Sequence, residues 1–197
     1  MHHAAVAIPV NVMRTLAHEL RQPLSTIESI AYYLTLILPE DQKVREQLDR
    51  IQHLVEQSNW MITSGQFLSE GLTVAREEFG LGGWLAQINL LDFNLDLTAA
   101  PDIISADPAL LRGVVENLMI LFRQFPERPI LRISECVVFE FFSPAPGYRS
   151  ESSLGPGASL SIQGARRVAE AHGGSLVVSI DPSNGVTLRL TLPEHQA

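Results

Sequence analysis

Residues 15–25 read TLAHELRQPLS, and this stretch decides how the first part of the chain folds. Apolar residues recur there every three or four positions, which predicts one face of an α-helix, made of Leu16, Leu20, Leu24, Ile27, Ala31, Leu34 and Ile37. His18 falls on the opposite face with Gln22, Ser25 and Ser29, in water. A neutral imidazole held outward on a helix is a nucleophile that can carry a group covalently. The alternative is a solvent-exposed histidine with no role.

The composition describes a globular protein and excludes several classes of function. The chain has 197 residues, of which 46% are apolar and 18% charged, enough for one or two small domains. A net charge of −8 argues against a nucleic-acid-binding protein and against strong attraction to anionic membranes. No apolar run reaches the roughly 18 residues of a membrane span, so we expect no membrane insertion and a cytoplasmic location. The single cysteine, Cys136, lies in the apolar run 135–142 and is expected to be buried.

Residues 1–70 predict an antiparallel helical hairpin. The first helix is expected over residues 10–38, with a bend at Pro23, and Pro39-Glu40-Asp41 ends it. Asp41 is expected to cap a second helix that reaches about residue 68 and carries the heptad stripe Val44, Leu48, Ile51, Val55, Ser58 and Ile62. A lone hairpin leaves apolar surface bare. We therefore expect a homodimer, in which two hairpins form a four-helix bundle.

Residues 71–197 predict a second domain of mixed helices and strands, which makes the whole chain α+β. Helices are expected over residues 85–90, 107–125 and 158–172, and strands over 91–97, 130–134, 137–142, 175–180 and 186–192. Asp107 is the expected N-cap of the second of these helices. His172 ends the third, where the helix dipole favours a charged histidine. The pattern contains no spacing typical of metal ligands.

Together these segments resemble the core of a two-component histidine kinase. Residues 18–24 resemble the H-box of that family, residues 107–118 its N-box helix, and residues 155–162 with 171–174 its G2 box and the following helix. The resemblance implies an N-terminal antiparallel helical hairpin for dimerisation and phosphoacceptance. An α/β sandwich like the family's ATP-binding domain would follow it.

The resemblance also implies roles for the residues around His18. In the family the acidic residue after the histidine orients or deprotonates the imidazole, which assigns that role to Glu19. Arg21 would offset the charge of a phosphoryl group. Gln22 stands where the family often has Thr or Asn, a position that supports dephosphorylation of the partner. We therefore expect His18, Glu19, Arg21 and Gln22 to form the catalytic site.

The positions that resemble the family's nucleotide site depart from its pattern. Asn117 matches the first asparagine of the N-box, but Leu121 stands where a second asparagine would serve magnesium, and leucine has no oxygen to offer. Ser143 replaces the aspartate that would bind adenine, and the loop after it is short. We expect a vestigial nucleotide site near Asn117, Ser143, Gly147, Gly155 and Gly157, with no ATP, no metal and no other cofactor.

An intact H-box beside a degenerate nucleotide site is similar to bacterial histidine phosphotransferases built on a kinase scaffold. His18 would then accept a phosphoryl group from the aspartate of one response-regulator receiver domain and donate it to another. A hybrid or sensor kinase would stand upstream in this phosphorelay. Two alternatives remain, an ATP-dependent sensor histidine kinase that autophosphorylates His18 and a non-catalytic pseudokinase scaffold.

Overall fold

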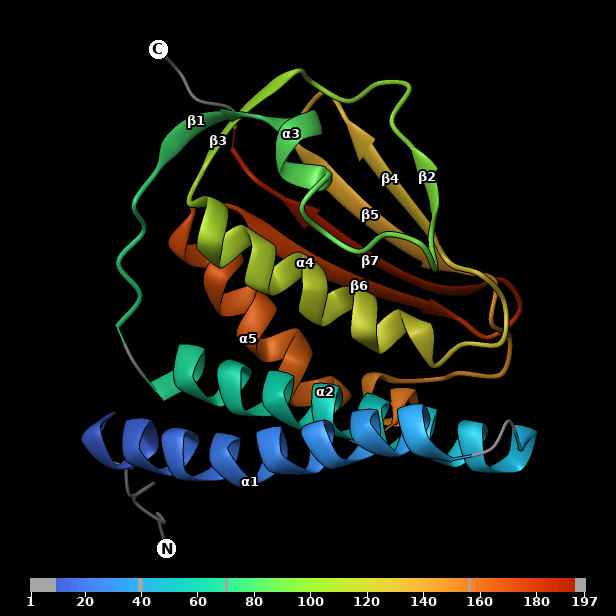
Figure 1. Cartoon of the computed structure of the whole chain (residues 1–197). Helices are drawn as coiled ribbons and strands as arrows, with labels where there is room; N and C mark the ends of the chain where they lie inside the picture. The colour runs from blue at the N-terminus through green and yellow to red at the C-terminus, as the bar shows by residue number, and fades with distance from the viewer. Residues whose placement is uncertain (1–9, 39–40, 70, 156, 194–197) are drawn as a thin grey trace, which may run out of the picture. The chain divides into compact units, whose positions relative to one another are not determined.

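The computed structural model describes residues 10–38, 41–69, 71–155 and 157–193 (Figure 1). Two compact units divide between Gly71 and Leu72. The first is a helical hairpin and the second an α/β unit with a mixed sheet, so the predicted α+β class is confirmed. Pro39 and Glu40 lie outside the described residues. Within the described part of the chain, no helix has the length and apolar character needed to cross a membrane.

The hairpin consists of α1 (Val10–Ile37) and α2 (Gln42–Ser69), each of 28 residues. Pro23 lies inside α1 and does not interrupt it. Asp41 caps α2 as predicted, because its Oδ1 accepts the backbone N–H groups of Lys43 and Val44 at 2.8 and 3.3 Å. The two helices contact each other through a narrow seam of buried side chains, namely Ala17, Ala31, Leu48 and Val55.

This seam is narrower than the apolar face predicted for α1. Ala31 is buried, but Leu16, Leu20, Ile27 and Ile37 are 43–54% exposed. The reason is that α1 contacts α2 through the small side chains of Ala17 and Ala31, which let two helices approach closely. The larger side chains are left on a neighbouring stripe that faces away from α2.

The second unit is built on a five-stranded sheet. Its strands lie in the order β2 (Asn94–Asp96), β4 (Ile130–Ser134), β5 (Val138–Ser143), β7 (Gly185–Thr191) and β6 (Ser175–Asp181). Only the β2–β4 pair is parallel. The helices α4 (Pro108–Arg123) and α5 (Ala158–Ala171) pack together over one face (Figure 1). Fully buried side chains fill the space beneath them, including Phe122, Leu131, Ile133, Phe139, Phe141 and Leu188.

Smaller elements surround this sheet, and some differ from the predictions. β1 (Glu77–Gly80) pairs with β3 (Ile103–Ala106), and neither was predicted. A short α3 (Leu81–Leu85) replaces the helix expected over 85–90, and η1 (Glu151–Leu154) is a 3₁₀ turn. The strand expected over 91–97 shrinks to β2, because residues 91–93 form a turn in which only Phe93 is buried.

The turn between β4 and β5 also corrects a prediction. Cys136 is exposed there, since it lies at the turn and not within the strand. Val137 follows it with a φ of 49°, a left-handed conformation that is an outlier for a β-branched residue. Its side chain is 7% exposed and its carbonyl accepts the backbone N–H of Leu192 at 3.1 Å. Burial and this hydrogen bond hold the strained conformation.

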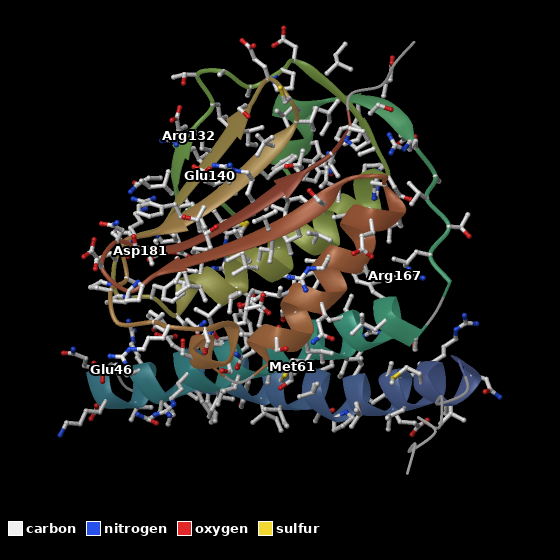
Figure 2. All side chains as sticks on the ribbon, turned by 180° about the vertical axis from the view of Figure 1, so that it is seen from behind. Glu46, Met61, Arg132, Glu140, Arg167 and Asp181 are labelled. Carbon is white, nitrogen blue, oxygen red and sulfur yellow. The ribbon has the colours of Figure 1, made fainter. Side chains whose placement is uncertain are left out.

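The sheet face opposite the helices carries a ladder of alternating charge. Asp96, Arg132, Glu140 and Arg189 lie directly opposite one another on β2, β4, β5 and β7, and Figure 2 shows Arg132 beside Glu140. Arg132 donates to Asp96 at 2.8 Å and to Glu140 at 3.1 Å, and Arg189 donates to Glu140 at 3.1 Å. The hydrogen bond from Arg132 lowers the pKa of Asp96 to about 2. The ladder favours this register, because a shift of one residue would turn these side chains to the other face.

A buried histidine joins the end of α5 to the start of α4. His172 is 1% exposed, and its Nε2 accepts the backbone N–H of Asp107 at 3.0 Å. Its Nδ1 therefore carries the proton and donates to the Val168 carbonyl at 2.8 Å. This arrangement needs an uncharged ring, so the predicted interaction of a charged histidine with the helix dipole is wrong.

Asp107 is the other half of this joint and caps α4 as predicted. Its Oδ1 accepts the N–H groups of Ala109 and Leu110 at 3.1 and 3.0 Å. Its Oδ2 accepts the N–H of Ala75 at 3.0 Å, which ties the segment before β1 to the same point. The guanidinium of Arg76 donates to the carbonyl of His172. One carboxylate and one imidazole thus hold three segments together.

We predict that His172→Ala destabilises the second unit by about 2–4 kcal/mol, because it opens a cavity and leaves the buried N–H of Asp107 without an acceptor. Urea unfolding measures the change in a Trp60→Phe background, where the fluorescence comes from Trp84, which is buried in this unit. His53→Ala on α2 is the matched control and should leave this transition unchanged. An unaltered midpoint for His172→Ala would show that the joint is dispensable.

Candidate functional site

His18 stands out from the surface of α1, with 70% of its side chain exposed. Ala17, the preceding residue, is 1% exposed against α2, and successive residues on a helix are about 100° apart. The Oε1 of Glu19 lies 3.9 Å from the Nδ1 of His18. An exposed pair at this distance adds little stability. It leaves Nε2 as the imidazole nitrogen that faces away from the carboxylate.

Arg21 is held by α2. Its Nη2 donates to the hydroxyl of Thr63 at 3.0 Å and to the Oε1 of Gln66 at 2.8 Å. Thr63 in turn donates to the backbone carbonyl of Asn59 at 3.0 Å. The guanidinium therefore links the two helices one turn away from His18. Its action on a phosphoryl group stays a prediction.

The polar face predicted around His18 is open to solvent. Gln22, Ser25 and Ser29 are all exposed. The hydroxyl of Ser29 donates to the carbonyl of Ser25 at 2.8 Å, so it is directed along the helix. Gln22 lies one turn after His18, and its side chain is the polar group that follows His18 on this face.

The residues that match the nucleotide boxes are mostly covered by protein. Asn117 is 3% exposed on α4, and Leu121, one turn later, is 6% exposed. Ser143 is fully buried at the end of β5, and its hydroxyl has no hydrogen-bond partner in the described part of the chain. Asn117 is therefore not a surface residue, and Ser143 offers a ligand no accessible surface.

The three candidate glycines have backbone reasons to be glycine. Gly147, Gly155 and Gly157 have φ angles of 99°, 100° and 78°, which L-residues with a side chain rarely adopt. A Cβ at Gly155 would also lie 2.9 Å from the side-chain oxygen of Gln124. That same amide donates to the carbonyl of Leu154 at 2.6 Å. A tight turn into α5 explains Gly155 and Gly157 without a phosphate, and the backbone N–H of Gly147 donates to the carbonyl of Pro182 at 3.0 Å.

The segment between β5 and α5 is packed in a compact form. Ser150 and Ser153 make reciprocal capping hydrogen bonds around η1. The ring of Tyr148 meets that of Phe125 edge-on at 5.1 Å, and Leu154 is 1% exposed. Leu121 and the buried Ser143 stand where the resemblance expects ligands for magnesium and adenine, and neither side chain fits that role.

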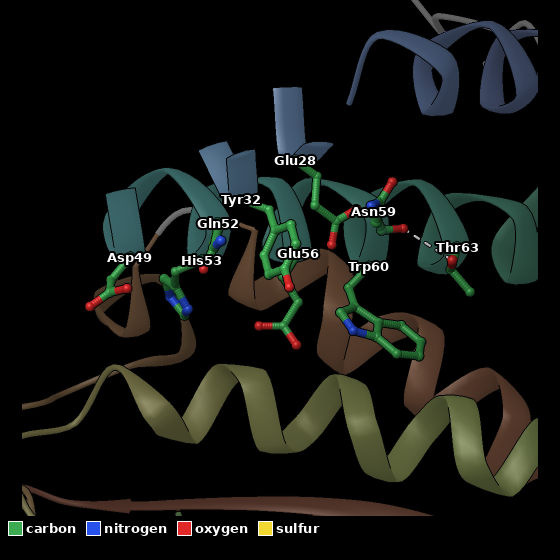
Figure 3. A pocket seen from close by; sticks show the side chains of 9 residues that line it. All are labelled: Glu28, Tyr32, Asp49, Gln52, His53, Glu56, Asn59, Trp60 and Thr63. Atoms are coloured by element: carbon green, nitrogen blue, oxygen red, sulfur yellow. Dashed lines mark hydrogen bonds between the residues drawn. The ribbon is translucent and has the colours of Figure 1, made fainter. Parts of the chain in front are cut away.

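The hairpin has a second feature that the sequence analysis did not predict. A hollow of about 650 Å³ lies between α1 and α2, which we call the hairpin groove (Figure 3). It is lined by Glu28, Tyr32, Asp49, Gln52, His53, Glu56, Asn59, Trp60 and Thr63. The sequence could have indicated it, because the groove residues of α2 recur at intervals of one or three and therefore lie on one face of that helix.

Comparisons with known proteins identify the fold. The sensor protein FixL of Bradyrhizobium diazoefficiens is 26% identical over 98% of this chain and 45% of its own length. Full-length ShkA in complex with AMPPNP has a TM-score of 0.64 at 18% identity, covering 96% of this chain and 47% of that one. The Acinetobacter baumannii histidine kinase AdeS has a TM-score of 0.54 at 18% identity, covering 89% and 98%. No protein-family model matches the chain.

The fold is that of a histidine kinase core, a phosphoacceptor-type hairpin followed by an ATP-binding-type domain. The chain spans about half the length of FixL and of ShkA.

Proposed function

We propose that this chain carries phosphoryl groups on His18 in two-component signalling, as a histidine phosphotransferase between receiver domains. The observation that carries the proposal is the geometry of His18, an exposed imidazole on a helix with Glu19 at its Nδ1. The histidine-kinase fold adds support, because the H-box match lies on the hairpin of that fold.

The transfer reaction requires few groups from this chain. The Nε2 of His18 attacks the phosphorus of an aspartyl phosphate, a nitrogen–phosphorus bond forms, and the bond to the aspartate oxygen breaks with its electrons. Glu19 stabilises the proton on Nδ1 as the ring gains positive charge. The receiver domain supplies the aspartate and its divalent cation. The reverse step, onto a second receiver, completes the transfer.

The source of the phosphoryl group distinguishes this proposal from its main alternative. AdeS is a histidine kinase and ShkA is seen with a nucleotide analogue, so the comparisons favour the ATP-dependent sensor kinase over the phosphotransferase. Against this, Leu121 and the burial of Ser143 oppose nucleotide binding. We give this chain's own residues the greater weight.

We predict that phosphorylated receiver domains label the full chain at His18. The label should be stable in base and labile in acid, and peptide mapping should place it on residue 18. His18→Ala should lose all label while keeping its helical content by circular dichroism, because the position is exposed. If no receiver or kinase labels the chain, the phosphotransfer proposal is wrong and the chain is a scaffold. The same conclusion follows if the His18→Ala variant keeps the signalling output.

We predict that the chain binds AMPPNP with magnesium more weakly than about 1 mM, since neither the adenine nor the magnesium position has its ligand. Calorimetry measures this, with ShkA as the positive control because it is known in complex with AMPPNP. Micromolar binding would instead make the ATP-dependent kinase the preferred function.

The exposed apolar stripe of α1 supports assembly through a second copy of the hairpin. Leu16, Leu20, Ile27, Ile30 and Ile37 are separated by steps of four, seven, three and seven, so they share one face. All are at least 43% exposed. Buried apolar area is the main driving force for such association. A four-helix bundle would cover this stripe and leave the face of His18 open.

We predict a homodimer with twice the chain mass of 21.7 kDa in light scattering at micromolar concentration. Ile27→Lys should convert it to a monomer, because it places a charge inside the apolar stripe. Ser29→Lys, two residues away on the opposite face, is the matched control and should remain dimeric. A monomeric wild type would contradict the proposed bundle.

A further inference from the structure

We propose that protonation of His172 opens the joint between α5 and α4 and releases residues 72–76 from the second unit, so that acid loosens the connection between this unit and the hairpin. Among the histidines of the described chain, His172 is the buried one, whereas His18 is exposed and His53 partly exposed. Residues 72–76 form neither helix nor strand and lie between α2 and β1. The transfer chemistry proposed for His18 makes no use of this buried ring.

The ring of His172 fits the closed joint only without a proton on Nε2. This nitrogen accepts the backbone N–H of Asp107 at 3.0 Å, while Nδ1 donates to the carbonyl of Val168 at 2.8 Å. A proton on Nε2 would set one donor against another. The residue is 1% exposed, so solvent cannot replace the lost hydrogen bond while the joint stays closed. Protonation and the closed joint therefore exclude each other.

The joint also holds both anchors of residues 72–76. The Oδ2 of Asp107 accepts the N–H of Ala75 at 3.0 Å, and the guanidinium of Arg76 donates to the carbonyl of His172. The Oδ1 of the same carboxylate caps α4. If this carboxylate turned toward a charged ring, it would give up these bonds. Arg76 adds a like charge beside the ring, which further disfavours its protonation in the closed form.

The other charged groups around the joint do not compensate for a proton on the ring. Arg112, the first charged residue of α4, pairs with Glu116 at 3.1 Å. β6, which packs against α5, has no titratable side chain before Asp181 at its far end. The nearby carboxylates of α5 and β1 belong to exposed residues, namely Glu170, Glu77 and Glu78. A charged ring would therefore take its partner from Asp107, at the expense of the bond to Ala75.

The direction of the pH effect follows from the number of protons bound. The ring is neutral in the closed joint, whereas in the open joint it can take up a proton, as an imidazole in water does with a pKa of about 6.5. Falling pH therefore favours the open joint, whose population rises about tenfold between pH 7.5 and 5.5. Carboxyl groups in water titrate about two to three pH units lower, so this range of pH addresses the ring.

Hydrogen exchange of the full chain tests this switch. It is followed amide by amide by NMR at pH 7.5 and 5.5 and corrected for the intrinsic exchange rates. We expect the amides of Ala75 and Asp107 to lose protection about tenfold at pH 5.5. At both pH values they should be at least tenfold less protected than those of Leu131 and Ile133, which lie in the central strand β4 and exchange when the whole unit unfolds.

Two variants assign the effect to the ring. His172→Gln should remove the pH dependence, because its side-chain oxygen can accept the N–H of Asp107 and does not titrate. His53→Ala is the matched control and should lose protection at pH 5.5 like the wild type. If His172→Gln does not fold, the wild-type ring decides. Its nitrogen NMR signals must show an unprotonated Nε2 at pH 5.5 while the protection of Ala75 falls.

Several outcomes would overturn the switch. These are equal protection of Ala75 and Asp107 at the two pH values, an unchanged pH dependence in His172→Gln, its loss in His53→Ala, and a ring that is protonated in the closed joint. Protection equal to that of Leu131 and Ile133 would overturn the release of residues 72–76, because the joint would then open only with the whole unit. None of these measurements depends on labelling of His18, so the proposed function and this switch fail separately.

Discussion

The burial of Ala17 against α2 is the constraint on which the rest of the hairpin depends. A methyl group at this position lets the helices approach closely, and helical geometry then turns His18 about 100° away, into water. The same seam passes through Ala31 and leaves Tyr32 outward in the same way. Arg21 strengthens this arrangement through Thr63 and Gln66, one turn after His18. The packing between two helices thus determines both exposed features of the face.

Much of this architecture follows from local pattern. The helices were predictable because their apolar repeat and their caps, Asp41 and Asp107, agree. Long-range pairing was not. β1 and β3 have four residues each, and their sequences do not alternate between polar and apolar residues. Leu91 belongs to a run that does alternate in sequence, but it lies in an exposed turn. The exposure of His18 was predictable from periodicity, whereas the contacts of Arg21 and His172 depend on residues more than forty positions away.

The two units use charge differently. In the second, opposite charges alternate across the sheet from Asp96 to Arg189 and satisfy one another. In the hairpin, three carboxylates share one groove without a lysine or arginine among its lining residues. Opposite charges that pair across neighbouring strands favour one register of the sheet.

Val137 has a consequence for the order in which the sheet forms. Its left-handed backbone is unfavourable for a β-branched residue, so the turn between β4 and β5 does not promote its own closure. The compensating hydrogen bond comes from Leu192, just beyond β7, which lies more than fifty residues later in the chain. The stability of this hairpin therefore depends in part on the segment that follows β7. We expect the hairpin to form late in folding, together with β7, and not as a local nucleus of the sheet.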